Sequence, residues 1–376
     1  MKKKSVAKKS RSARNPGKSS AGGGRSGTKT GKGILVTGAL GFIGSNVALA
    51  LAKKGRVIGL DMINPNELGP DHPLQKRFNQ LKRAGIEYIQ GELTDSGLPQ
   101  RLESVLANCH ALVHTAAPVK EKGPLEQFRA VNVEATLRLA QTARNQGVKR
   151  WVQLSSVMVY GFNYPPHVSE EGPLRGDDNP YCITKIESEH ALLGLSDVRS
   201  MDVVILRPGD VYGPASVPWV VRPLEMMRKK QFLLLDGGRY TINHVHISHI
   251  VQAIELALKS SGGQIFNVTD GISSTCGEYF GALAAMAGYA PPPSIPSWAA
   301  RMGALIMEGG SALIGREAQL NREALKFVMR PHPVSSRKAT ELLGYRPKVS
   351  LTEGLEEIRS WLHEERPDLL APGLTK

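Results

Sequence analysis

Tyr181 and Lys185 are the residues whose types and spacing most directly suggest acid–base chemistry in this chain. They stand four positions apart in a helical pattern, so both side chains are expected on one helix face. A neighbouring ammonium lowers the pKa of a phenol from about 10 toward working pH, which would let Tyr181 accept or return a proton. A Tyr and a Lys at this spacing also occur by chance on helix surfaces, so the pair needs independent support.

Three glycines provide that support. Gly38, Gly41 and Gly44 follow the apolar run 33–37 and precede a helical pattern. In this context the first glycine allows the turn, the second lets the backbone approach a pyrophosphate, and the third permits close helix packing. Asp61 ends the next strand-like run, where its carboxylate would accept hydrogen bonds from the adenosine ribose. Glycines can also merely mark a turn, but the two features together predict a bound dinucleotide.

Asp61 also predicts that the dinucleotide is NAD rather than NADP. Its carboxylate would repel a 2′-phosphate, because like charges at short range disfavour each other. Neither Met62 nor Ile63 supplies the arginine that would neutralise this repulsion.

The TGxxGxxG spacing that begins at Thr37, together with Tyr181 and Lys185, resembles the extended short-chain dehydrogenase/reductases of the NAD-dependent epimerase/dehydratase family. The resemblance implies that the catalytic residues are Ser156, Tyr181, Lys185 and Asn132, the last supporting Lys185 through water. It implies that the cofactor is bound by Gly38, Gly41, Phe42, Ile43, Gly44, Asp61, Glu92, Leu93, Thr115, Ala116, Ala117, Ser155, Tyr181, Lys185, Pro208 and Gly209. Glu92 departs from the family, which usually has Asp at this position.

The elements that must position these residues follow from the hydrophobic pattern. From residue 33 onward short apolar runs alternate with helical patterns, which predicts an α/β fold with a Rossmann-type doubly wound parallel sheet. Residues 62–85 are interpreted only as a polar excursion, and prolines after Gly213 predict a smaller, discontinuous C-terminal substrate lobe. The predicted division is a disordered basic tail at 1–32, an NAD-binding domain at 33–213 with a return segment at about 242–260, and a substrate-binding lobe at 214–241 and 261–376.

Local departures guide the choice of reaction, because the fold alone does not select one. Dehydratases carry Thr-Asp-Glu where this chain has Ser155, Ser156 and Val157, so dehydration is not expected. Nucleotide-sugar enzymes usually carry Arg-Asp-Phe where residues 242–244 stand here, although Arg239 could substitute as the anion anchor.

The C-terminal third resembles the 3β-hydroxysteroid dehydrogenase-like branch of the family, which implies an apolar small-molecule substrate. Side chains that would suit an apolar pocket are Trp219, Met226, Met227 and Trp298, although each is as readily explained as lobe core. The main hypothesis is NAD-dependent interconversion of a secondary alcohol and a ketone on a steroid-like or other hydrophobic substrate. The alternatives are an NAD-dependent nucleotide-sugar epimerase and a non-catalytic NAD-binding regulatory protein whose tail binds nucleic acid.

The formal charge of +14 is concentrated in residues 1–33, which contain lysines and arginines but no Asp or Glu. Contact with nucleic acid or an anionic membrane is therefore expected only through this tail, if at all. Three widely spaced cysteines favour a reducing compartment, so a cytoplasmic location is expected, and a homodimer is possible. No transmembrane segment is expected. His244, His246 and His249 lack a nearby acid or cysteine cluster in the sequence, so no metal is predicted.

Overall fold

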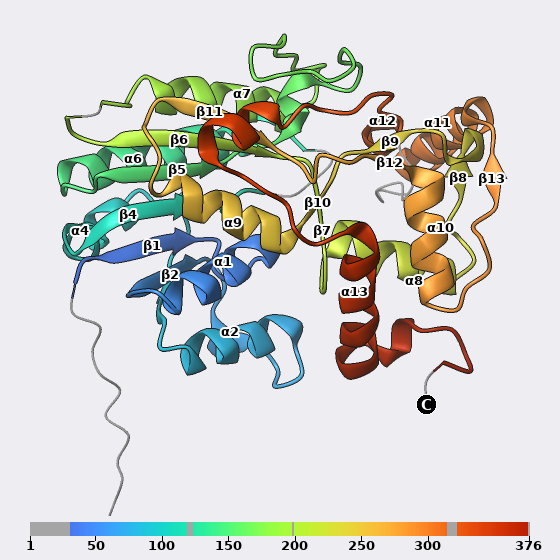
Figure 1. Ribbon diagram of the computed structural model, residues 1–376, viewed down its shortest axis with the longest axis horizontal. Coiled ribbons are helices and arrows are strands. Elements are labelled where there is room, and N and C mark those ends of the chain that lie inside the picture. Colours follow the sequence, from blue (N-terminus) through green and yellow to red (C-terminus); the bar gives the residue numbers. More distant parts are fainter. Residues whose placement is uncertain (1–30, 119–122, 198, 314–321, 375–376) are drawn as a thin grey trace, which may run out of the picture. The chain divides into compact units, whose positions relative to one another are not determined.

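A parallel sheet forms the centre of the computed structural model, which describes residues 31–118, 123–197, 199–313 and 322–374. Its seven strands run in the order β11-β6-β5-β4-β1-β2-β3 (Figure 1). Their bounds are β1 Gly33–Thr37, β2 Val57–Asp61, β3 Glu87–Gln90, β4 Cys109–His114, β5 Arg150–Leu154, β6 Asp202–Pro208 and β11 Gln264–Val268. The doubly wound parallel sheet predicted from the sequence is thus confirmed.

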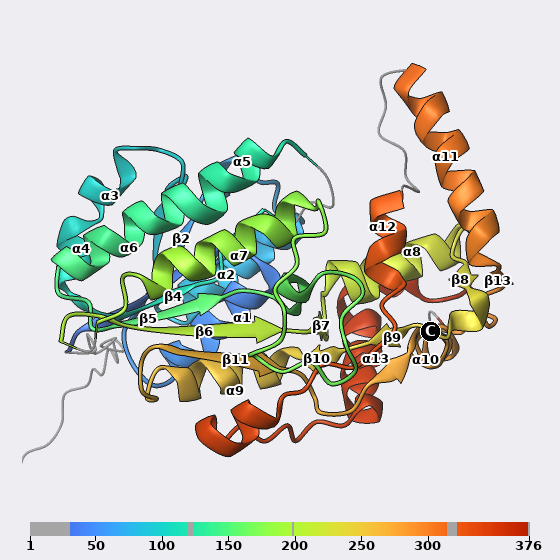
Figure 2. The same ribbon diagram turned by 90° about the horizontal axis from the view of Figure 1, so that it is seen from above.

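Two layers of helices explain why the central strands are almost continuously apolar. On one face lie α1 Phe42–Ala52, α2 Pro73–Arg83 and α9 Ile247–Ala257, whereas α3 Leu98–Arg101, α4 Glu103–Ala107, α5 Leu125–Arg129, α6 Thr136–Asn145 and α7 Pro180–Leu193 lie on the other (Figure 2). Each layer has its own core, and Leu35 and Val36 of β1 point into opposite ones. Strands covered on both faces need apolar side chains at consecutive positions. β3, which ends the sheet, is only partly buried.

A second group of elements lies beyond the carboxyl ends of the strands. It contains the helices α8 Arg222–Arg228, α10 Cys276–Met286, α11 Ser297–Leu313, α12 Arg322–Val328 and α13 Leu351–Glu365. Three short strand pairs accompany them: β7 Asp210–Tyr212 with β10 His244–His246, β9 Thr241–Ile242 with β12 Ser274–Thr275, and β8 Leu234–Leu235 with β13 Ser294–Ile295. Tyr212, Leu224, Tyr279, Leu283 and Ile358 share a core here that is separate from the two cores of the sheet.

Two parts of the chain differ from the sequence expectations. The polar excursion contains α2, which begins at a Pro with His72 accepting a hydrogen bond from the Leu74 N–H and has one fully buried residue, Leu81. The central sheet also includes β11, so the chain returns to it beyond the segment of about 242–260. Residues 1–30 of the predicted tail lie outside the described residues. The proposed division into a cofactor domain and a substrate lobe stays a prediction.

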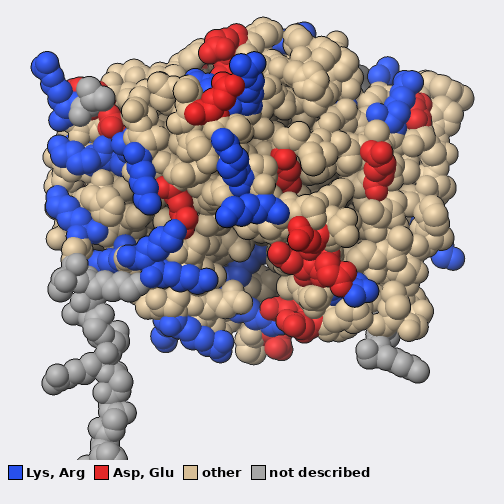
Figure 3. All heavy atoms as spheres, viewed as in Figure 1, with Lys and Arg blue, Asp and Glu red and all other residues tan. Residues whose placement is uncertain are grey.

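Charges on one face of the described residues are unevenly distributed. Lys and Arg side chains gather over the sheet half, whereas Asp and Glu side chains gather over α13 (Figure 3). None of the helices in the described part of the chain is long and apolar enough to cross a membrane. Cys109, Cys182 and Cys276 are all buried free thiols.

Candidate active site

The glycine loop between β1 and α1 is built for close approach of the backbone. Gly38 has a φ of +67°, which favours glycine, and a Cβ on Gly44 would lie 2.0 Å from the Gly38 carbonyl oxygen. α1 begins after Gly41 without a side-chain cap, so the N–H groups of its first turn are not satisfied by a capping side chain. Phe42 and Ile43 are the first two residues of this turn. Such a helix N-terminus fits the pyrophosphate of a dinucleotide.

Asp61 lies beside this loop at the end of β2. Its two carboxylate oxygens accept hydrogen bonds from the Leu40 N–H, at 2.9 Å, and the Ile63 N–H, at 3.2 Å. The carboxylate is therefore held in one orientation next to the glycine loop. This placement agrees with the adenosine ribose contact expected from the sequence.

The carboxyl end of β4 forms the next wall of the predicted cofactor site. Thr115 donates its hydroxyl to the Thr37 carbonyl at 2.7 Å, and the N–H groups of Thr115 and Ala116 both donate to the Thr37 hydroxyl. Ala116 backbone atoms would lie 3.0 Å from a Cβ on Gly38, so this segment packs tightly against the loop. Ala117 follows in the same segment, which has neither helix nor strand after β4.

His114 is a buried support that the sequence analysis did not single out. Its ring nitrogens hydrogen-bond to the Thr37 hydroxyl at 2.9 Å and the Thr136 hydroxyl at 3.1 Å, and the ring stacks on Trp151. Burial, with the nearby Lys185 ammonium, lowers the pKa of His114 to about 3. The imidazole is therefore neutral at ordinary pH and joins β1, β4 and α6 beneath the site.

Tyr181 and Ser156 meet where α7 begins. Asn179 accepts hydrogen bonds from the N–H groups of Tyr181 and Cys182, and Pro180 occupies the first turn, so the helix start fixes the position of Tyr181. Ser156 follows β5 and caps the turn Val157–Tyr160, and it lies near enough to Tyr181 to lower the pKa of the phenol. The structure thus brings together two of the predicted catalytic residues.

Lys185 lies one turn along α7 and is also buried. Its ammonium donates to the Leu154 carbonyl at 3.0 Å and lies 5.7 Å from the centre of the Tyr181 ring. Burial lowers the pKa of Lys185 to about 8, against the effect of Glu189. Burial raises the pKa of Tyr181 to about 12, although the Ser156 hydrogen bond opposes this. The lowering of the Tyr181 pKa expected from Lys185 is therefore not present in this geometry.

Asn132 lies beside the same helix, within a π-helical turn, Ala130–Ala135. Its amide donates to the Thr184 hydroxyl at 3.0 Å, while its Oδ1 is buried without a hydrogen-bond partner among the described residues. Local π-helical geometry often occurs at functional sites, because it re-aims a side chain. Because Asn132 contacts Thr184, the neighbour of Lys185 in the chain, its buried acceptor fits the predicted water-mediated support, which stays a prediction.

The remaining predicted residues occupy different positions around the sheet. Ser155 directly follows β5 and has a buried hydroxyl without a hydrogen-bond partner among the described residues. Pro208 ends β6, and a Cβ on Gly209 would lie 2.0 Å from the Asn243 carbonyl oxygen, which explains the glycine. Leu93 packs against the core beneath α3 and α4, whereas Glu92 is exposed and accepts a hydrogen bond from Thr94.

A buried ion pair near Tyr181 was missed. Arg330 donates to both Asp210 oxygens, at 2.7 and 2.8 Å, and its Nη1 lies 3.7 Å from the Met158 sulfur. By contrast, Arg239 is exposed and pairs with Asp236. The sequence offered only a lone Arg in "VMRPHP" as a signal, and no local pattern identifies its partner 120 positions away.

Some residues considered for an apolar pocket lie elsewhere. Trp219 and Met227 belong to the core shared by α8 and α10, and Trp298 is 69% exposed. Instead, the buried side chains of Met158, Phe162 and Cys182 form the apolar cluster against which Tyr181 packs.

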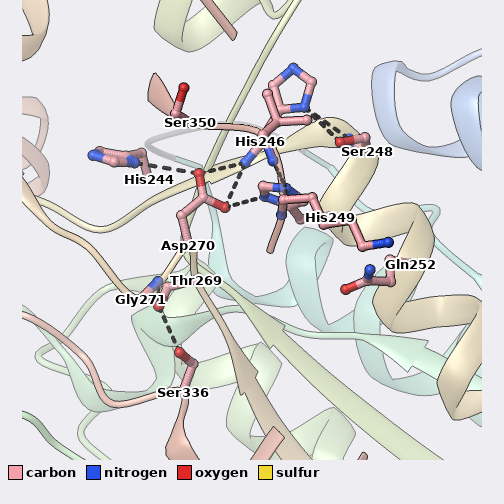
Figure 4. Close-up of polar contacts among 12 residues, drawn as sticks. His244, His246, Ser248, His249, Gln252, Thr269, Asp270, Gly271, Ser336 and Ser350 are labelled. Atoms are coloured by element: carbon pink, nitrogen blue, oxygen red, sulfur yellow. Dashed lines mark hydrogen bonds and ion pairs between the residues drawn. The ribbon is translucent and has the colours of Figure 1, made fainter. Parts of the chain in front are cut away.

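The three histidines converge on a carboxylate that the sequence analysis did not associate with them (Figure 4). Asp270 accepts hydrogen bonds from the His246 N–H and from His249 Nδ1, the latter at 2.6 Å, and lies 3.5 Å from His244 Nδ1. His249 Nε2 accepts the N–H groups of Lys348 and Val349, so its proton is on Nδ1. Among the described residues no group of His, Cys, Asp and Glu is arranged to hold a metal ion. This cluster therefore joins β10, α9, the loop after β11 and the segment before α13.

The sequence of the chain matches the model of a known protein family. The model described as "NAD dependent epimerase/dehydratase family" matches residues 34–269. The chain belongs to this family. As a member it is an NAD-dependent enzyme of the extended short-chain dehydrogenase/reductase type, and the glycine loop with Asp61 forms a fitting site for its cofactor NAD.

Several relatives in this family are enzymes of sugar nucleotides. UDP-glucose 4-epimerase of Vibrio cholerae is 28% identical, with 87% of this chain and 94% of the relative covered. Another relative is a 4-hydroxy-2-methyl-3-oxo-4-farnesyl-3,4-dihydroquinoline-1-oxide ketoreductase of Stigmatella aurantiaca. It is 26% identical, with 86% of this chain and 95% of the relative covered. The crystal structure of Thermotoga maritima UDP-glucose 4-epimerase with UDP-glucose has a TM-score of 0.70 at 24% identity. The match covers 88% of this chain and 99% of that structure's chain. This structural likeness supports the fold.

Proposed function

We propose that the chain is an NAD-dependent epimerase acting on a secondary hydroxyl of a nucleotide sugar. The observation that carries the chemistry is the Tyr181–Lys185 pair on α7, with the ammonium 5.7 Å from the centre of the Tyr181 ring. Ser156 follows β5 near the phenol, and the glycine loop lies beside the same edge of the sheet. The nucleotide-sugar part rests on the epimerase relatives. It replaces the hydrophobic-substrate hypothesis as the first choice.

The chain's own groups manage the proton in this proposal. Tyr181 Oη takes the hydroxyl proton as the carbon–hydrogen bond breaks, and returns it after the sugar has turned its other face. Ser156 donates a hydrogen bond to the same substrate oxygen and orients it. Bound NAD supplies the hydride acceptor and donor, so the cycle has no net oxidation. Lys185 places a positive charge near the phenol and is positioned to hold the ribose.

A second candidate is net oxidation or reduction of an apolar alcohol or ketone. The apolar cluster of Met158, Phe162 and Cys182 beside Tyr181 favours it, as does the ketoreductase relative. Arg330, the buried cation near this cluster, already pairs with Asp210, so it is not a free anchor for a diphosphate.

One experiment separates the two candidates. The purified chain is incubated with NAD and UDP-glucose, and the sugar configuration and NADH absorbance are followed together. The epimerase proposal expects inversion at one carbon without accumulation of NADH. Accumulation of NADH with hydroxysteroids or other apolar alcohols, and no inversion of any UDP-sugar, would instead establish the second candidate. A cytoplasmic location, a homodimer and any role of the basic tail remain predictions from the sequence.

A further inference from the structure

An aromatic side chain from the C-terminal region lies near the predicted catalytic residue Tyr181. Phe327 of α12 and Tyr181 of α7 both pack against one small cluster of buried side chains, Met158, Phe162 and Cys182. The rings of Phe327 and Phe162 meet edge to face, with their centres 5.1 Å apart. Phe162 is in turn fixed through its N–H, which donates to Asp177 at 2.7 Å. Phe327 is therefore part of the wall next to the proton-transferring phenol.

The position of Phe327 is set by the buried ion pair. Arg330 Nε donates to the Phe327 carbonyl at 2.8 Å, while the other end of the guanidinium makes its two bonds to Asp210. The Arg330 side chain is only 2% exposed, and that of Asp210 is 9% exposed. Both bonds to Asp210 come from Nη2, and together with the Nε bond to Phe327 they hold the end of α12 against β7.

The same pair makes this wall electrically neutral. The Arg330 charge is compensated by Asp210, and the cluster against which Tyr181 and Phe327 pack consists of an aromatic ring, a thioether and a thiol. Lys326 is exposed and places its ammonium 5.7 Å from the centre of the Phe162 ring. A neutral aromatic wall suits the C–H face of a ring, whereas a carboxylate pressed against it would lose hydration without gaining a partner.

We propose that Phe327 is a specificity-determining residue, which selects neutral hexose rings over hexuronates at the position beside Tyr181. This inference rests on the proposed nucleotide-sugar function and specifies its substrate class. Arg330 and Asp210 act through Phe327 as positioning residues, because their contacts fix the segment that carries the ring.

The test compares kcat/KM for UDP-glucose and UDP-glucuronate in the wild type and in Phe327→Leu. The wild type is expected to favour UDP-glucose, and the variant to lose roughly tenfold of that preference, the size of an aromatic contact. The loss should appear mainly in KM, with the pH profile of turnover unchanged. Phe232→Leu is the matched control, because Phe232 packs on Phe280 in the α8–α10 core and should leave the ratio unchanged.

Asp210→Asn supplies a second variant with a different physical basis. It leaves the Arg330 charge uncompensated, so the relative activity with UDP-glucuronate should rise. A ratio that stays within about twofold of wild type in Phe327→Leu, in an enzyme that converts UDP-glucose, overturns this inference alone. If the wild type converts no UDP-hexose, the proposed function itself fails and the inference fails with it. Should Asp210→Asn not fold, as judged by thermal melting, Phe327→Leu decides.

Discussion

Tyr181 is protonated in the described geometry, and this has a direct consequence for the direction of proton transfer. Its pKa of about 12 follows from burial, and Lys185 is directed to the Leu154 carbonyl. The phenol is thus ready to give a proton, whereas taking one requires further stabilisation of the phenolate. The positively charged nicotinamide of NAD⁺ would provide such stabilisation by Coulomb attraction.

We predict that NAD⁺ lowers the pH at which Tyr181 ionises. Tyrosinate absorbance of the wild type minus that of Tyr181→Phe should show no ionisation up to about pH 10 without cofactor, because burial disfavours the phenolate. Addition of NAD⁺ should move this difference signal to lower pH. If NAD⁺ left the titration of Tyr181 unchanged, it would contradict the electrostatic role assigned to the nicotinamide.

Removal of only the phenolic oxygen tests the proton transfer itself. Tyr181→Phe should bind NAD nearly as well as the wild type and lose turnover by roughly 10² to 10⁴, the range for a general acid or base. Isothermal titration and steady-state rates measure the two effects separately. If the variant retains more than about a tenth of wild-type turnover, another group carries the proton.

Asp61 should set the preference for NAD over NADP. Asp61→Ala removes the charge that repels a 2′-phosphate, so the two affinities should approach each other. Because the carboxylate also accepts the Leu40 and Ile63 N–H groups, the melting temperature should fall as well. A wild type that binds NADP more tightly than NAD would disprove this assignment.

At the scale of elements, the β1–α1 junction requires glycine at position 44, because a Cβ has no room there. Gly44→Ala would place a Cβ 2.0 Å from the Gly38 carbonyl oxygen, so the loop must shift and NAD affinity should collapse. We expect a loss of stability of about 1–3 kcal/mol. Gly55→Ala is the matched control, since nothing lies within 4 Å of its added Cβ. Equal NAD affinity in the two variants, measured by titration calorimetry, would refute the proposed role of this junction.

Local pattern was sufficient for the strands and helices that carry this loop. Short apolar runs predicted the central sheet, because burial on both faces leaves a clear signal. α2 was missed because it faces solvent on most sides and buries only Leu81 fully, so its apolar stripe is narrow. The catalytic spacing was visible because Tyr181 and Lys185 belong to one helix.

At the scale of the whole molecule, sequence reasoning failed where distant segments meet. Asp210 and Arg330 come from different elements, as do Asp270 and His249, and neither pair leaves a periodic signal in the chain. The substrate region depends on such pairs, which is why the apolar residues selected from the sequence were partly misplaced. Trp298, for example, follows the helical pattern of α11 but faces away from any described core.

Buried histidines predict the pH dependence of folding. Burial and the neighbouring His249 lower the pKa of His246 to about 4, against the effect of Asp270. In the unfolded chain a His titrates near 6.5, so His246 contributes full stability above that pH and loses it as the pH falls toward 4. The loss should be on the order of 3 kcal/mol for His246 alone, and His114 acts in the same direction. Denaturant unfolding at each pH measures it.

His246→Asn is the control for this dependence. Asn can still cap α9 by accepting the Ser248 N–H, as His246 does, but it does not titrate. Its unfolding free energy should vary less between pH 6.5 and 4 than that of the wild type. An identical slope in both proteins would show that His246 is not responsible.

His249 has one more consequence, for the exchange of backbone hydrogens with solvent. The amides of Lys348 and Val349 lie in a stretch without helix or strand, where exchange is ordinarily fast. Both donate to the buried Nε2 of His249, whose ring is held by Asp270. In deuterated buffer these two amides should therefore keep their hydrogens about as long as amides of the central strands. They would report, residue by residue, how often the segment before α13 separates from α9.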